Sequence, residues 1–66
     1  MEIKINGKNV SVDNVYNMSD LIKSKDLSVD RIVVEYNYVI VPKEKWETTT
    51  ISHGDNIEIV SFVGGG

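Results

Sequence analysis

The chain has 66 residues, which is enough for one domain, and a chain of this length buries only about 60% of the surface that its unfolded form exposes. With 41% hydrophobic and 26% charged residues, its composition is that of a folded globular domain whose thin core leaves little room for a deep pocket. Seven Lys and Arg against ten Asp and Glu give a net charge of −3, which disfavours binding to nucleic acid and favours a protein partner with a basic face.

Cysteine is absent from the sequence, so the chain has neither a disulfide framework nor thiolate ligands for a metal. Any sulfur chemistry must therefore use sulfur brought by another protein. No apolar run approaches the ~18 residues of a membrane span. We expect a cytoplasmic protein that does not associate with membranes.

The N-terminal segment predicts a β-hairpin. Ile3 and Ile5 alternate with polar residues, and so do Val10 and Val12, as in two half-buried strands. Asn6-Gly7 between them is typical of a type I′ turn, which requires positive φ at both central residues. The first two strands should therefore be antiparallel neighbours.

A short helix is predicted over residues 18–25. Asn17 is a candidate N-cap with Asp20 three residues later, the spacing of a capping box, and Tyr16 and Leu21 occupy the positions of a hydrophobic staple. Two turns of helix are marginal alone, so packing on a sheet must hold them. The apolar face consists of Met18, Leu21 and Ile22.

After a loop over 26–30, residues 31–36 are rich in β-branched side chains and predict a third strand. Asn37-Tyr38 predicts a tight reversal into a short fourth strand over 39–41. Pro42 should end that strand, because proline has no N–H to donate to a neighbouring strand.

The segment 42–46 predicts a single helical turn that starts at the proline, with Trp46 as an aromatic lid on the small core. Residues 48–50 are β-branched and polar, which favours an extended connection, and Ile51 should anchor it. A turn over 52–55 then leads to the last strand.

That last strand should contain Ile57, Ile59 and Val60 and continue into Phe62 and Val63. One helix must cover the apolar face of about five strands, so we expect an α+β domain in two layers, with the sheet wrapped around the helix. We assign this domain to residues 1–63 and a flexible tail to residues 64–66.

The tail is the candidate functional element. Gly64, Gly65 and Gly66 have no side chains, so they add nothing to a core and can enter a channel too narrow for other residues. Their only reactive group is the α-carboxylate of Gly66. The alternative interpretation is a frayed end without a role.

Several short segments follow one another at characteristic spacings: Asn37, Val41-Pro42-Lys43, Trp46, Gly54-Asp55, Ile57-Glu58-Ile59 and the closing glycines. Their order and spacing resemble the ThiS family, the sulfur carriers of thiamine biosynthesis. Most members have arginine at the position of Lys43, and two terminal glycines suffice for the family's motif where this chain has three. The resemblance covers essentially the whole chain.

The resemblance implies a β-grasp, or ubiquitin-like, fold with the first and last strands parallel and adjacent in the middle of the sheet. It also implies that a ThiF-like adenylyltransferase uses ATP to adenylate Gly66. A cysteine desulfurase or another persulfide donor then supplies sulfur, and the resulting thiocarboxylate donates it to a ThiG-like thiazole synthase. The chain itself would bind no cofactor or metal and would be a cosubstrate, not an enzyme.

In this scheme Gly66 is modified, and Gly64 and Gly65 thread the partner sites. Phe62 and Val63 are candidates for docking, although Phe62 could equally close the core. His53 lies in a turn without a nearby nucleophile, so a catalytic role is not expected. Four glutamates, Glu35, Glu44, Glu47 and Glu58, are scattered in the sequence and are expected to be solvated.

Two other functions are also compatible with the sequence. The small subunit of molybdopterin synthase shares the fold, the tail and the thiocarboxylate chemistry, but it is usually longer and lacks the 41–46 pattern. The second alternative is a β-grasp interaction domain or protein modifier whose tail is inert or joined to lysines. Sulfur transfer to the C-terminus separates both carriers from this last class.

Overall fold

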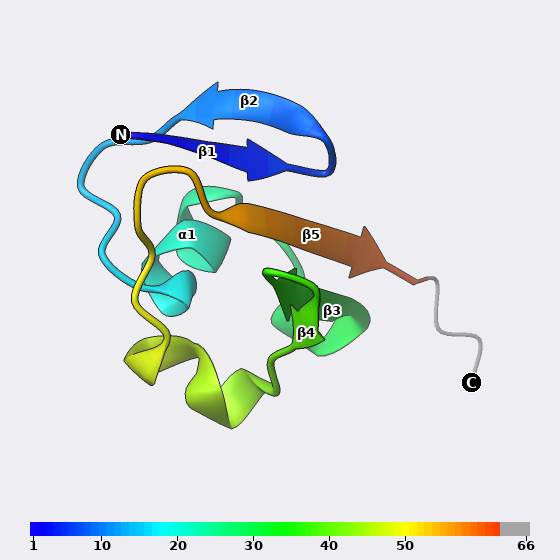
Figure 1. Cartoon of the computed structure of the whole chain (residues 1–66). Coiled ribbons are helices and arrows are strands. Elements are labelled where there is room, and N and C mark those ends of the chain that lie inside the picture. Colours follow the sequence, from blue (N-terminus) through cyan, green and yellow to red (C-terminus); the bar gives the residue numbers. More distant parts are fainter. Residues whose placement is uncertain (63–66) are drawn as a thin grey trace.

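The structure, a computed structural model, describes residues 1–62. A five-stranded mixed sheet in the order β2-β1-β5-β3-β4 packs against one α-helix, as the sequence predicts (Figure 1). Two 3₁₀ helices, η1 and η2, lie in the connections. The elements are β1 (Glu2–Ile5), β2 (Lys8–Ser11), α1 (Met18–Ser24), η1 (Val29–Arg31), β3 (Ile32–Tyr36), β4 (Val39–Ile40), η2 (Lys43–Thr48) and β5 (Asn56–Ser61).

Both predicted hairpins form. The first turn residue of each is an asparagine whose backbone adopts the left-handed conformation. Asn6 and Gly7 have φ of 51° and 82° between antiparallel β1 and β2, and Asn37 and Tyr38 have φ of 48° and 72° between β3 and β4. Asparagine tolerates this region better than other residues with a β-carbon. These local signals were therefore sufficient to place both turns.

The capping box of α1 is present. The Oδ1 atom of Asn17 accepts from the Asp20 N–H at 2.8 Å, while Asp20 Oδ2 accepts from the N–H groups of Asn17 at 3.3 Å and Tyr16 at 3.0 Å. The predicted hydrophobic staple is not supported, because 71% of the Tyr16 surface is exposed while Leu21 is completely buried. Tyr16 instead uses its carbonyl to accept from the Ile51 N–H at 2.9 Å.

The connections contain more helix than predicted. Part of the expected loop before β3 is η1, so the strand begins at Ile32 and not at residue 31. η2 extends through Thr48, where an extended connection was expected, because the hydroxyls of Thr48 and Thr49 donate to the Lys45 carbonyl. Pro42 caps η2 from an extended conformation and does not begin the helix.

The core lies between the helix and the concave face of the sheet. Trp46 is buried there, as predicted, and its Nε1 donates to the Val41 carbonyl at 3.0 Å. None of the helices in residues 1–62 is long and apolar enough to cross a membrane. The buried residues are Ile3, Ile5, Val15, Met18, Leu21, Ile22, Ile32, Val34, Trp46, Ile51 and Ile57.

Candidate site at the end of the central strand

The central strand β5 leads directly to the predicted functional tail. It is bordered on one side by β1, which runs parallel to it, and on the other by β3, which runs antiparallel. The parallel and adjacent first and last strands that the family resemblance implied are therefore confirmed. Four of the predicted site residues, Val63, Gly64, Gly65 and Gly66, lie outside the described residues.

The two neighbours of β5 do not support it over the same length. The register with β1 runs from Lys4↔Asn56 to Ile5↔Ile57, whereas the register with β3 continues to Ile32↔Ser61. The Phe62 N–H then donates to the Arg31 carbonyl at 2.9 Å. The last residues before the tail are thus held by β3.

The face of the sheet opposite the helix has an exposed apolar patch, which we call the sheet patch and define as Val33, Ile40 and Val60. Val33 pairs with Val60 across β3 and β5, and Ile40 pairs with Glu35 across β4 and β3. Directly opposed residues share a face of a sheet, and these three side chains are 38% to 63% exposed. Apolar side chains exposed on one face of a small domain make that face a candidate surface for a protein partner.

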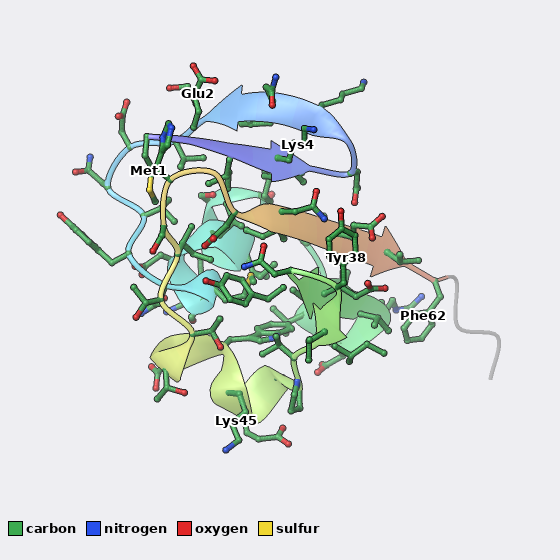
Figure 2. All side chains as sticks on the ribbon, in the orientation of Figure 1. Met1, Glu2, Lys4, Tyr38, Lys45 and Phe62 are labelled. Carbon is green, nitrogen blue, oxygen red and sulfur yellow. The ribbon has the colours of Figure 1, made fainter. Side chains whose placement is uncertain are left out.

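Phe62 lies at the carboxyl end of β5 (Figure 2). Its side chain is 48% exposed and is not one of the core residues, so the interpretation that Phe62 closes the core is wrong. Phe62 follows Val60 by two residues, and residues with this spacing lie on the same face of an extended chain. Phe62 therefore extends the exposed apolar surface toward the tail. The structure leaves its predicted role in docking open.

Two of the four glutamates that seemed scattered in the sequence are brought together. Glu35 and Glu58 are direct cross-strand neighbours next to the sheet patch, and both are half-buried. Like charges in this arrangement are destabilising. The sequence alone did not predict this pair, because the register between β3 and β5 depends on contacts across the whole domain. The only signal in the sequence was that each glutamate has an outward position within its own strand.

The fold alters the ionisation of Tyr36, the last residue of β3. Its hydroxyl lies 3.1 Å from the Thr50 carbonyl, to which it donates. The Asp55 carboxylate competes as an acceptor for the same proton, and hydrogen bonding to it raises the pKa of Tyr36. Burial of the phenol and the negative charge of Asp55 also raise this pKa. The phenol therefore stays neutral and acts as a structural link between β3 and the loop before β5.

Other polar residues of interest have structural contacts. His53 Nδ1 accepts from the Glu2 N–H at 3.1 Å, which ties the turn before β5 to β1. Lys43 Nζ lies 3.1 Å from Asp30 Oδ1 in an exposed ion pair that joins η2 to η1. Within residues 1–62, no three His, Asp or Glu side chains are grouped closely enough to hold a metal ion.

Comparison with known proteins identifies the family. The family model described as "ThiS family" matches residues 3–66, which is nearly the whole chain and includes the glycine tail. The chain belongs to the ThiS family. A solved relative agrees, since the crystal structure of the thiamine biosynthesis protein ThiS from Geobacter metallireducens superposes with a TM-score of 0.85 at 32% identity, with both chains covered completely. The β-grasp fold that the resemblance implied is thereby confirmed.

Three relatives of this ThiS-family chain cover almost all of it. The sulfur carrier protein ThiS of Bacillus subtilis is 37% identical over 65 residues, which are 97% of this chain and 98% of that protein. An uncharacterized protein, ycf40, of Trieres chinensis is 44% identical over 62 residues, which are 94% of this chain and 85% of that one. A thiazole synthase of Paramagnetospirillum magneticum is 32% identical over all 66 residues, but these are only 20% of its length.

Proposed function

We propose that this chain is a sulfur carrier for the formation of the thiazole moiety of thiamine. The observation that carries the proposal is the family match, which continues from the β-grasp domain through Gly66. The similarity to the Bacillus subtilis carrier supports it over nearly the full length of both proteins. In this role the chain is a cosubstrate of other enzymes.

The chemistry takes place at the Gly66 carboxylate, which is a poor electrophile until it is activated. A carboxylate oxygen attacks the α-phosphate of ATP in the active site of a ThiF-like adenylyltransferase, and pyrophosphate leaves. A persulfide sulfur supplied through a cysteine desulfurase then attacks the acyl carbon and displaces AMP. A thiol breaks the sulfur–sulfur bond, forms a disulfide with the donor and leaves a C-terminal thiocarboxylate.

Docking uses the sheet patch together with Phe62 and Val63, and Gly64 and Gly65 pass into the partner's channel. The activating enzyme is the partner for this surface, because a −3 carrier with Glu35 and Glu58 beside the patch is complementary to a basic face around an ATP site. A partner cation placed between the two carboxylates would relieve their repulsion. Their unfavourable proximity in the free protein thus favours association.

The second partner is a ThiG-like thiazole synthase, which receives the sulfur. The relative from Paramagnetospirillum magneticum supports this, since a segment similar to the whole of this chain makes up a fifth of a thiazole synthase. The family match also favours the thiamine pathway over molybdopterin synthase. A pull-down with each large partner, at equal concentration, distinguishes the two pathways.

The test of the function is the intact mass of the purified chain after incubation with a ThiF-like enzyme, ATP, cysteine and a desulfurase. We expect a mass gain equal to the exchange of one oxygen for sulfur, located at Gly66 by fragmentation. A chain without Gly65 and Gly66 serves as the control and should not change. An unchanged mass with enzymes that convert the Bacillus subtilis carrier would refute the proposal.

A further inference from the structure

The side chain of Asn6 continues the pairing of β1 with β5 after the strand itself has ended. Ile5↔Ile57 is the last backbone register between the two strands, and the Asn6 N–H donates to the Ile57 carbonyl at 2.9 Å. Two residues further along β5, the Asn6 carboxamide bonds to both backbone groups of Ile59. Its Nδ2 donates to the Ile59 carbonyl at 3.1 Å, and its Oδ1 accepts from the Ile59 N–H at 2.8 Å.

A carboxamide has the same donor and acceptor as a peptide group. Asn6 therefore acts as one additional peptide unit of β1 at the place where the main chain turns away toward β2. Asparagine, aspartate and glycine all suit the first position of this turn, but only asparagine provides both a donor and an acceptor. The turn alone does not explain the choice of residue.

Asn37 makes a corresponding contact at the opposite end of β5. It is the first residue of the β3–β4 turn, and its Oδ1 accepts from the Asn56 N–H at 2.8 Å while its Nδ2 donates to Asp55 Oδ1 at 3.3 Å. Asn37 thus holds the start of the central strand, and Asn6 holds it near the exit. The two turns therefore contact β5 at different positions, Asn37 at the first residue, Asn56, and Asn6 three residues later at Ile59.

Within residues 1–62, no residue of β1 is in register with β5 beyond Ile57. On that side of β5, the bonds from Asn6 to Ile59 are therefore the last support that β1 gives before the chain reaches Phe62. On the other side, β3 supports the strand to its end. A strand held along only one edge can twist about that edge, so the contact at Ile59 limits the twist of the residues between Ile59 and Phe62.

We propose that Asn6 is a positioning residue for the C-terminal tail, which directs the end of β5 toward the active site of the activating enzyme. The inference rests on the proposed function, since it concerns the delivery of the Gly66 carboxylate. Asn6 does not contact the reacting atoms. Its effect on the reaction comes from the fraction of docked carriers whose tail enters the site.

The test compares Asn6→Gly with Asn37→Gly. Glycine adopts positive φ without strain, so both variants keep their turns, and each loses two hydrogen bonds of a side-chain carboxamide near one end of β5. Hydrogen exchange of the Ile59 amide, measured by NMR, should accelerate by roughly five- to thirtyfold in Asn6→Gly, as expected from the loss of one or two hydrogen bonds. In Asn37→Gly, hydrogen exchange of the Asn56 amide should accelerate, while that of the Ile59 amide should not.

The kinetic test measures ATP–pyrophosphate exchange by the activating enzyme at a series of carrier concentrations. Asn6→Gly should lower kcat by about fivefold with an unchanged KM, because docking through the sheet patch is intact while fewer tails are aligned. Asn37→Gly should leave both constants unchanged at a temperature where both variants are fully folded. Asn6→Asp, which keeps the acceptor but places a carboxylate against the Ile59 carbonyl, should also lower kcat.

Equal kcat values for Asn6→Gly and the wild type would overturn the inference, and so would an equal loss in Asn37→Gly, since that would show a general effect of stability. Neither result would affect the proposed function, which requires only that the wild-type chain be adenylated. A wild-type chain that supports no exchange with an enzyme competent on another carrier would reject the function itself.

Discussion

At the scale of single residues, the sheet contains an arrangement that stability alone does not favour. Glu35 and Glu58 face each other across β3 and β5, next to the exposed sheet patch. In a domain of 66 residues, whose total stability is about 3 to 10 kcal/mol, even a fraction of a kcal/mol is a measurable share. A side chain that costs stability in the free protein is a candidate for a role in binding.

Replacing one of these glutamates should therefore separate stability from binding. We expect Glu58→Gln to raise the free energy of unfolding by about 0.2 to 1 kcal/mol, because it removes the like-charge repulsion. The same change should weaken binding to the activating enzyme, and the difference from the wild type should shrink as salt screens the charges. Urea denaturation and calorimetric titration at two salt concentrations measure the two effects.

Glu44→Gln is the matched control, since Glu44 is exposed on η2 and is not part of the cross-strand pair. It removes the same charge from the whole molecule. If both variants weaken binding equally, net charge and not the position of Glu58 determines the affinity.

The stability of the domain should also depend on pH through Tyr36. A raised pKa means that the folded state favours the neutral phenol. The resulting stabilisation is fully present below about pH 10, the ordinary value for tyrosine, and is lost as the pH rises through the higher pKa of the folded state. Tyr36→Phe should thus be less stable than the wild type at pH 8, and the difference should narrow above pH 10.

Urea midpoints measured between pH 8 and pH 11 for the wild type and the variant test this expectation, at roughly half-unit steps around the ordinary tyrosine pKa. Tyr38→Phe is the control, because its phenol is 76% exposed. A constant difference between Tyr36→Phe and the wild type over this range would contradict the assignment.

At the scale of secondary-structure elements, the sequence predicts most reliably where the signal is local. The turns at Asn6-Gly7 and Asn37-Tyr38 and the capping box of α1 depend on residues within a few positions of one another, and all three form. The C-terminal part of η2 was missed because threonine has weak helix propensity, and the hydroxyl bonds from Thr48 and Thr49 to the Lys45 carbonyl appear only in the folded chain.

The capping box carries a further prediction for α1. With only seven residues, this helix has few internal hydrogen bonds, so its first turn depends on Asn17 and Asp20. Asn17→Ala should cost about 1 kcal/mol, which corresponds to a fall in Tm of about 4 to 8 °C for a domain of this size. Thermal unfolding followed by circular dichroism measures it; Ser24→Ala, at the end of the helix, is the control and should have a smaller effect.

At the scale of the whole molecule, the candidate site could be predicted only in part. Composition predicts the tail and the family resemblance implies its chemistry, but the tail lies outside the described residues, so both stay predictions. In contrast, the sheet patch, the Glu35–Glu58 pair and the bonds from Asn6 to Ile59 join residues that are distant in sequence. Their proximity is a consequence of strand order and register, which depend on how one helix packs on five strands.

Shortening a side chain to alanine should have different effects in the core and on the surface. Leu21→Ala removes a completely buried side chain and should cost about 2 to 5 kcal/mol, which is a large part of the total stability. Phe62→Ala should change stability by less than about 1 kcal/mol but raise the KM of the activating enzyme for the carrier. Denaturant unfolding and adenylation kinetics of both variants test the distinction; a large loss of stability in Phe62→Ala would place this side chain in the core.

The position of β5 also has a consequence for biosynthesis. The ribosome makes β5 after every other described element, yet this strand joins the β1–β2 hairpin to β3 and β4 in the middle of the sheet. A nascent chain therefore lacks its central strand until β5 has been made, and the five-stranded sheet cannot form before then. A chain that ended before β5 would lack the central strand, so an incomplete product would not compete as a folded carrier for the proposed activating enzyme.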